Sequence, residues 1–387
     1  TEYFNYLGTD KMTAEQLKQK FYELACSYSI NVGSRTLQVS ISGLAENMTE
    51  AMTLMEDFIA NAKVDKDAYD KYVGIVEKSR ADNKLDQRVN FNRLQQYGMY
   101  GPYNGARNMP SSTELKEMDP QKLVDMIKDL KNYKHSVLYY GPMDLKTLTA
   151  TINKKHKTAK KLADVPQNKP YKLQQTAQNE VLIAPYDAKN IYMIQYHNEG
   201  NTWNAEQEPI AALFNEYYGG GMNTVVFQEL REARGLAYSA FAMYGTPSYK
   251  DDTEFAYTYI ISQNDKMMDC INTFNSILDT MPQSEKAFEL SKQALMKRLA
   301  TSRTTKTGIL NAYINAENLG IDYDINKKIY EAVPSLTLED VAKFEKENMA
   351  NKPYRYMILG DEKQLDMKAL EKIGPVKRLT TEEIFGY

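Results

Sequence analysis

The sequence predicts an α+β protein made of two tandem related domains, each with an antiparallel-rich sheet and helices packed on one face. Residues 36–42 and 254–262 alternate apolar and polar side chains, which is typical of half-buried strands. Residues 47–59 and 264–278 carry apolar side chains, several of them Met, at helical spacing. Because a strand pattern precedes a helix pattern in both places, we expect one fold to occur twice.

An internal repeat supports this organisation. Matching residues recur in the same order, first 210 and later 219 positions apart: Phe4-Asn5 with Phe214-Asn215, Tyr28-Ser29 with Tyr238-Ser239, and residues 137–141 with 356–360. Each match alone is weak, but their collinear order indicates two copies of one domain, which we call the first copy and the second copy.

The domain boundary is predicted at a polar, lysine-rich stretch. We expect a first domain over residues 1–155, a linker over 156–178 and a second domain over 179–387. The second domain opens with two strand patterns and a helix pattern within 181–220, and these have no counterpart ahead of Phe4. The first domain is therefore expected to be truncated at its N-terminus, as part of a longer protein.

Local patterns predict the remaining elements. Thr13 and Gln16 have the spacing of a capping box, which favours a helix directly after Thr13. We expect two long helical stretches, then a last helix and a last strand, at residues 65–97, 284–318, 336–349 and 354–360.

Bulk composition excludes several classes of protein. The hydrophobic fraction of 42% and charged fraction of 26% are those of a globular protein. A net charge of −3 gives no general reason to expect nucleic acid as a partner. No run of 18 apolar residues occurs, so no membrane span is expected. The two cysteines, Cys26 and Cys270, make no disulfide framework and suit core packing.

The sequence offers no complete catalytic or metal site. Of the three histidines, His135 is expected to begin a strand, His156 to lie in the linker and His197 to end a strand. None stands in HExxH or HxxEH, and a zinc site needs several ligands at such spacing. We therefore expect structural roles for all three, no cofactor, and no stoichiometric zinc in this chain.

A glycine run at residues 219–221 resembles a phosphate-binding loop only superficially. It lacks the GK[ST] ending and follows a helix rather than a strand. An interhelical turn is the better prediction for this run.

The segment LREARGLAYS, residues 230–239, carries the most specific polar pattern. Gly235 is a natural helix stop, and a turn there would bring the Arg231 guanidinium and the Tyr238 hydroxyl to one surface. Two fixed donors of this kind suit a carbonyl or a developing oxyanion. The residues alone favour the plainer alternative, an Arg that caps carbonyl groups and a Tyr at a strand end.

The run FNEYYGGGMNTVVFQELREARGLAYSAFAMY, residues 214–244, resembles the pitrilysin/insulinase family of zinc metallopeptidases. With the tandem copies, the resemblance extends over nearly the whole chain. It implies two clam-shell halves, each of two related α+β domains, with the zinc held by HxxEH in the first half. Because this chain lacks HxxEH, it is similar to the C-terminal, non-catalytic half, the third and fourth domains.

The resemblance also implies roles for residues. In the family an Arg and a Tyr seven residues apart reach the scissile carbonyl, and these positions fall on Arg231 and Tyr238. The first copy has Tyr28 but carries Phe21 in place of the Arg. The implied function is the substrate-holding, non-zinc-binding half of a zinc endopeptidase that hydrolyses peptides in an enclosed chamber, and this chain alone is expected to be inactive.

The implied partners are a peptide substrate and a zinc-bearing catalytic half, in the same polypeptide or as a separate subunit. One alternative is a non-proteolytic scaffold or assembly subunit of the same fold. A second alternative, a solute- or glycan-binding module, rests only on the 29 Tyr. We expect a soluble protein; the sequence does not indicate its compartment, and the bacterial periplasm and the cytoplasm both stay open.

Overall fold

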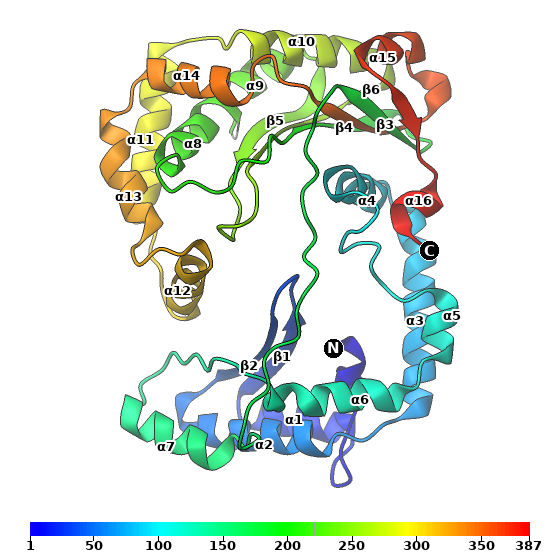
Figure 1. Cartoon of the computed structure of the whole chain (residues 1–387), viewed down its shortest axis with the longest axis vertical. Coiled ribbons are helices and arrows are strands. Elements are labelled where there is room, and N and C mark those ends of the chain that lie inside the picture. The colour runs from blue at the N-terminus through cyan, green and yellow to red at the C-terminus, as the bar shows by residue number, and fades with distance from the viewer. Residues whose placement is uncertain (220) are drawn as a thin grey trace. The chain divides into compact units, whose positions relative to one another are not determined.

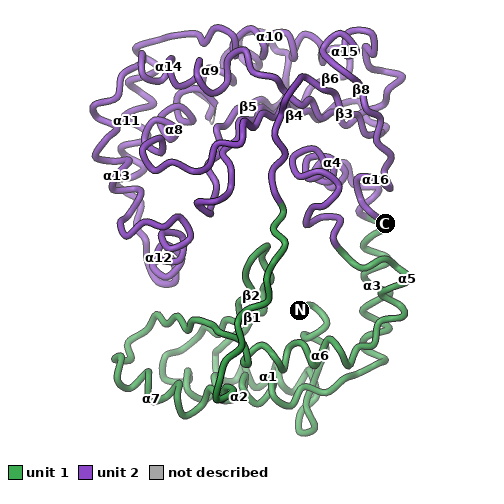
Figure 2. The backbone as a smooth tube through the Cα atoms, viewed as in Figure 1, with its two compact units in different colours: residues 1–82, 109–171 green, residues 83–108, 172–387 purple. Residues whose placement is uncertain are grey.

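A computed structural model of the chain describes residues 1–219 and 221–387. The chain forms two compact units (Figure 2). The first unit comprises residues 1–82 and 109–171, and the second comprises residues 83–108 and 172–387. The boundaries of the units follow packing, so residues 83–108 belong with the second unit although they lie in the first copy. The boundaries expected for the two repeat copies stay a prediction.

The first unit contains a two-stranded antiparallel sheet of β1 (Cys26–Val32) and β2 (Leu37–Gly43). Its helices and helical turns are η1 (Glu2–Tyr6), α1 (Ala14–Glu23), η2 (Ala45–Asn47), α2 (Met48–Asn61), α3 (Lys66–Leu85, as far as residue 82), α5 (Ser112–Glu117), α6 (Pro120–Asp129), η3 (Leu130–Asn132) and α7 (Leu145–Lys155). The strand predicted at 36–42 and the helix predicted at 47–59 are thereby confirmed.

Sequence-local signals account for several of these boundaries. The Thr13 hydroxyl accepts from the Gln16 amide, and the Gln16 side chain accepts from the Thr13 amide, so the predicted capping box begins α1. On α2, Met55 and Phe58 are buried, and Phe58 stacks on Phe4 with ring centroids 4.2 Å apart. The Met-containing stripe of this helix therefore belongs to the core.

The second unit is built on a six-stranded sheet in the order β5-β6-β4-β7-β3-β8. Its strands are β3 (Glu180–Pro185), β4 (Asn190–His197), β5 (Ala237–Gly245), β6 (Phe255–Gln263), β7 (Arg355–Gly360) and β8 (Val376–Arg378). Neighbours from β5 to β7 pair antiparallel, whereas β3 pairs parallel with β7 and β8. The sheet is thus rich in antiparallel pairs, but β7 is not the last strand, because β8 adds to the far edge.

Helices cover both faces of this sheet (Figure 1). The helices and helical turns of the second unit are α4 (Gln87–Tyr100), α8 (Glu208–Phe214), η4 (Asn215–Gly219), α9 (Val225–Phe227), η5 (Gln228–Glu232), η6 (Asn264–Lys266), α10 (Met267–Asp279), α11 (Glu285–Thr301), α12 (Thr307–Leu319), α13 (Ile325–Ala332), η7 (Val333–Ser335), α14 (Leu338–Asn348), η8 (Glu362–Gln364), α15 (Met367–Ile373) and α16 (Thr381–Phe385). One face packs on α8, α10, α11 and α14, and the other packs on α4 and α16.

The side chains of β3 are buried on both faces of the sheet, which explains why helices cover both faces. Val181 and Ile183 enter the larger core, while Leu182 and Ala184 enter the core beneath α4. A strand that is buried on both faces is apolar at successive positions rather than at alternate ones. The α+β class is confirmed, and the second layer of helices is an addition to the predicted single layer.

Two predicted helical stretches are interrupted. Asp86, in an extended conformation, separates α3 from α4, and its side chain accepts from the Val89 amide. Residues 302–306 separate α11 from α12. A single Asp therefore ends one helix and caps the next, which periodicity alone does not reveal. Among the described residues, no helix combines the length and the apolar character needed to cross a membrane.

Candidate functional site

The segment that carries Arg231 is a π-helical turn. In η5 the Ala233 amide donates to the Gln228 carbonyl oxygen at 2.8 Å, and the Leu236 amide donates to the Leu230 carbonyl oxygen at 2.9 Å. Gly235 ends the helix with a φ of +57°, in the left-handed region that favours glycine. Single π-turns are uncommon and frequently lie at functional sites.

Arg231 is an exposed cation with one described neighbour. Its guanidinium carbon lies 5.0 Å from the centroid of the Phe227 ring, one turn earlier. In the part of the chain that the structure describes, this guanidinium makes no hydrogen bond or ion pair, and it caps no backbone carbonyl. Arg234 on the same turn instead pairs with Glu229 at 3.5 Å. Within the described residues, the N–H groups of Arg231 are therefore not used by any protein acceptor.

Tyr238 lies at an irregularity in the edge strand β5. Ala237 pairs with Ser262 and Ser239 pairs with Ile261, so Tyr238 is the extra residue of a β-bulge. Bulges redirect side chains, and the Tyr238 side chain is 53% exposed. The Gln263 side-chain amide donates to the Tyr238 hydroxyl oxygen at 3.0 Å.

The two predicted site residues thus flank the turn at Gly235, and both are exposed. No described contact joins Arg231 directly to Tyr238. The segment between them is anchored to the core, because the buried Cys270 thiol donates to the Leu236 carbonyl oxygen at 3.4 Å. Burial raises the pKa of this thiol to about 11, so Cys270 is a packing residue rather than a nucleophile.

A close approach explains one member of the glycine run. A Cβ atom at Gly219 would lie 1.8 Å from the Ala242 carbonyl oxygen, so only glycine fits where this turn meets β5. Asn215 secures the same edge, because its amide nitrogen donates to the Tyr244 carbonyl and its oxygen accepts from the Tyr244 amide. Gly220 lies outside the described residues, so the interhelical turn predicted for the whole run stays a prediction there.

Two of the three histidines form a cluster in the first unit. His156 Nδ1 contacts the Glu56 carboxylate at 2.5 Å, and His156 Nε2 lies 2.8 Å from His135 Nε2. His135 Nδ1 donates to the Tyr133 carbonyl at 2.6 Å. His135 does not begin a strand, because residues 134–139 pair with no neighbouring strand. Within residues 1–219 and 221–387, no group of three or more His, Cys, Asp or Glu side chains is arranged to hold a metal ion.

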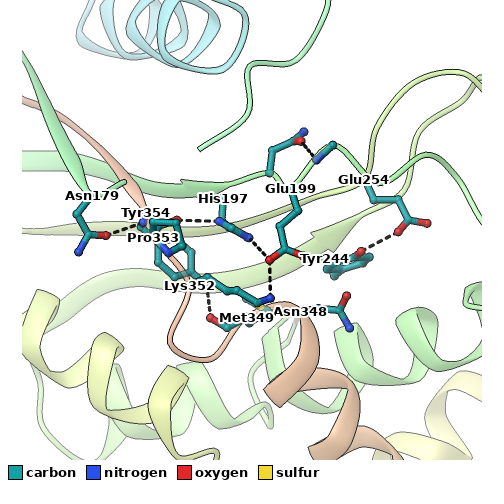
Figure 3. Close-up of polar contacts among 12 residues, drawn as sticks. Asn179, His197, Glu199, Tyr244, Glu254, Asn348, Met349, Lys352, Pro353 and Tyr354 are labelled. Atoms are coloured by element: carbon teal, nitrogen blue, oxygen red, sulfur yellow. Dashed lines mark hydrogen bonds and ion pairs between the residues drawn. The ribbon is translucent and has the colours of Figure 1, made fainter. Parts of the chain in front are cut away.

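His197 belongs to a buried polar network in the second unit (Figure 3). Its Nδ1 donates to the Pro353 carbonyl at 2.7 Å, and Glu199 lies between His197 Nε2 and the Lys352 ammonium. Burial lowers the pKa of His197, so the ring is neutral at neutral pH. The network fastens the end of β4 to the turn before β7, which is a structural use of the histidine.

The second unit also buries a carboxyl group that no sequence pattern indicates. Glu345 on α14 is only 3% exposed, and its Oε1 atom has no hydrogen-bond partner among the described residues. Burial, with a smaller contribution from the charge of Asp279, raises the pKa of Glu345 to about 8. The surrounding KFEKEN sequence resembles an ordinary solvated helix face, so only the fold reveals this group.

The family comparison matches the segment that holds the predicted site. The family described as the peptidase M16 inactive domain matches residues 118–295, which include Arg231 and Tyr238. The matched residues, just under half of the chain, are thus similar to the inactive domain of the M16 peptidases. This match supports the resemblance to the non-catalytic, C-terminal half of the pitrilysin/insulinase family.

Several solved protein structures share the fold of the chain. An M16 inactive domain from Pseudomonas fluorescens superimposes with a TM-score of 0.69 and 12% identity, covering 93% of this chain and 87% of that one. The periplasmic protease PqqL from Escherichia coli gives a TM-score of 0.69 and 12% identity, and the ferredoxin protease FusC, solved with Arabidopsis ferredoxin, gives 0.70 and 13%. These identities are too low to transfer activity.

The chain spans only part of the two proteases. It is 93% covered in both comparisons, but it accounts for 40% of the PqqL chain and 39% of the FusC chain. No curated protein sequence matches it at a significant level.

Proposed function

We propose that this chain is the substrate-holding, non-zinc-binding half of a zinc endopeptidase that hydrolyses peptides inside an enclosed chamber. The zinc and its ligands belong, in this proposal, to a catalytic half that lies in the same polypeptide or in a separate subunit. The alternative is a non-proteolytic scaffold of the same fold.

The proposal rests on the observation that the Arg231 guanidinium has no hydrogen-bond or ion-pair partner among the described residues. Arg234 on the same turn pairs with the Glu229 carboxylate, whereas Arg231 pairs with no carboxylate or carbonyl oxygen of the described residues. Arg231 has only the Phe227 ring beside it, which orients the guanidinium and leaves its donors free. A scaffold has no need to keep such a cation and an outward-facing phenol on the two sides of one turn.

The chemistry follows from the two donors. A planar guanidinium and a phenol on one turn can both donate to a peptide carbonyl oxygen and to the oxyanion that replaces it during hydrolysis. Their contribution grows as negative charge develops on that oxygen, so it favours the transition state over the bound substrate. Cleavage of the bond itself requires groups that this chain lacks, and the proposal assigns them to the catalytic half.

Turnover by the assembled enzyme tests the role of Arg231. In the longer protein, or in this chain mixed with its catalytic half, Arg231→Ala should lower kcat by about 10²–10³, the usual loss for an oxyanion donor. Arg234→Ala is the matched control, because Arg234 lies on the same turn and is already paired with Glu229. Equal rates for the two variants would return Arg231 to a structural role.

The sequence upstream of this chain separates the enzyme from the scaffold. An HxxEH motif with a later Glu in the adjoining half would supply the missing ligands and support the peptidase. An adjoining half without these ligands would favour the scaffold. The complex of the ferredoxin protease with ferredoxin makes a folded or partly unfolded protein a reasonable first substrate to assay alongside short peptides.

A further inference from the structure

Tyr238 has a single described hydrogen-bond partner, the side chain of Gln263, 25 positions further along the chain. We propose that Gln263 is a positioning residue, which holds the Tyr238 phenol so that its own proton is donated outward to the carbonyl oxygen of a bound peptide. This inference rests on the proposed function, because it assigns a supporting residue to the same site.

The Tyr238 hydroxyl has one proton, and its contact with Gln263 leaves that proton unused. The Gln263 Nε2 amide donates to the Tyr238 oxygen at 3.0 Å, so the hydroxyl acts as an acceptor in this contact. A phenol has one proton to donate, and this hydrogen bond does not use it. In the described chain no acceptor takes that proton, and the side chain is 53% exposed. The hydroxyl is therefore left as an outward donor.

The strand pairing places Gln263 where this contact can form. Ala237 pairs with Ser262 in antiparallel register, so Tyr238 and Gln263, each one residue further along its own strand, lie diagonally across that pair, within reach of two long side chains. Asn264 anchors the following turn, because its amide donates to the Ala188 carbonyl oxygen at 3.1 Å. The bulge turns the phenol away from the regular alternation, and the amide then fixes its direction.

The hydrogen bond also changes the strength of the phenol as a donor. When a hydroxyl oxygen accepts a hydrogen bond, its own O–H becomes more polarised, and the two bonds strengthen each other. Gln263 does not need to touch the substrate for this effect. The ligand class is a peptide carbonyl oxygen, and the benefit is largest when that oxygen carries developing negative charge.

Substitution of the amide by a carboxylate is the sharpest test in the active enzyme. In Gln263→Glu the carboxylate accepts the phenol proton, so kcat should fall as far as in Tyr238→Phe while KM changes little. The Tyr238→Phe/Gln263→Glu double variant should be no slower than Tyr238→Phe, because both changes remove one proton donor. In Gln263→Leu the phenol loses its support but keeps its proton, and kcat should fall about three- to tenfold. Additive losses in the double variant would overturn the proposal.

A spectroscopic measurement tests the contact in the isolated chain. With 3-fluorotyrosine incorporated, the ¹⁹F resonance of position 238, assigned by Tyr238→Phe, should move in Gln263→Leu. It should stay unmoved in Gln228→Leu, a control whose amide donates to the Met222 carbonyl instead. An unmoved resonance in Gln263→Leu would refute the contact.

These variants distinguish the proposed function from the positioning role of Gln263. If Arg231→Ala leaves turnover unchanged, the proposed function fails, whatever the ¹⁹F result. If Arg231→Ala slows turnover but Gln263→Glu does not, the proposed function stands and only the positioning role of Gln263 fails.

Discussion

The two copies of the helix–turn–strand segment place matching residues in opposite environments. In the first copy Phe21 is 3% exposed, and its ring centroid lies 4.7 Å from that of Tyr28. Tyr28 in turn lies edge-on to Phe58 at 6.0 Å. In the second copy Arg231 and Tyr238 occupy the same two positions and both are exposed. One copy thus uses these positions to build a core, and the other presents them at the surface.

Backbone irregularities accompany the difference. The first copy enters the turn from a regular α-helix, α1, and Tyr28 pairs with Ile41 in an uninterrupted ladder. The second copy enters from the π-turn η5, and Tyr238 is bulged out of the ladder. Because side chains alternate across a strand, one extra residue is enough to change the direction of a side chain. Two copies of a repeat can therefore keep matching positions while local backbone irregularities change the environment of the side chains there.

Reciprocal substitutions should break this comparison most strongly. Phe21→Arg places an unpaired cation among the buried rings of the first unit and should lower the free energy of unfolding by about 3–5 kcal/mol. Arg231→Phe changes an exposed side chain and should alter it by less than about 0.5 kcal/mol. Urea unfolding followed by circular dichroism measures both.

The single tryptophan provides a control for these two variants. Trp203 lies in the second unit, so its fluorescence reports the unfolding of that unit alone, whereas circular dichroism reports both. If Phe21→Arg costs no more than Arg231→Phe, the first copy does not use this position for its core.

Glu345 provides a second, smaller contrast between the units. The buried side chains of α6 in the first unit, Val124 and Ile127, are apolar, whereas α14 buries a carboxyl group. Its pKa is about 8 in the folded chain and 4.5 ordinarily, so between these pH values the folded chain holds a proton that the unfolded chain has released. Stability of the second unit should therefore fall as pH rises from 5 to 8, by on the order of 3–4 kcal/mol.

Replacement of the carboxyl group should remove this dependence. Glu345→Gln should flatten the unfolding free energy between pH 5 and pH 8, as followed by Trp203 fluorescence. The matched control is Glu347→Gln, an exposed residue of the same helix beside Lys343. If the slope survives in Glu345→Gln, another group must carry it.

Local patterns were sufficient to predict the α+β class, the capping box at Thr13 and most of the strands. They also placed Arg231 and Tyr238 on either side of a glycine turn. These features depend on residues close together in sequence, where periodicity and capping rules apply.

Other features depend on neighbours that are distant in sequence. The helical stretch predicted at 65–97 includes Phe91 and Leu94, but local patterns do not reveal that α4 packs through them on the sheet of the second unit. Residues 137–141 have the composition of a strand, yet they pair with no strand, because a strand forms only beside a hydrogen-bonding partner. The contact between Gln263 and Tyr238 also requires the register of β5 on β6, which the sequence does not display.

The smallest effect concerns the residue that reverses the chain at the same place in each copy. Ala25 has a φ of +47° where the second copy has Gly235 with a φ of +57°. A residue with a Cβ atom is destabilised by about 1–2 kcal/mol in this left-handed region of φ. This cost is partly offset, because glycine has more conformational freedom to lose from the unfolded chain. Ala25→Gly should therefore raise the free energy of unfolding of the first unit by about 0.5–1 kcal/mol.

The opposite change in the second copy should have the opposite sign. A Cβ atom at Gly235 would meet no atom within 4 Å, so the loss of about 0.5–1 kcal/mol expected in Gly235→Ala comes from the backbone alone. Gly74→Ala on the exposed face of α3 also meets no atom, but it should raise stability, because the helical backbone there suits alanine. Urea midpoints of the three variants compare these signs directly. If Gly235→Ala is as favourable as Gly74→Ala, the left-handed turn is not what both copies conserve.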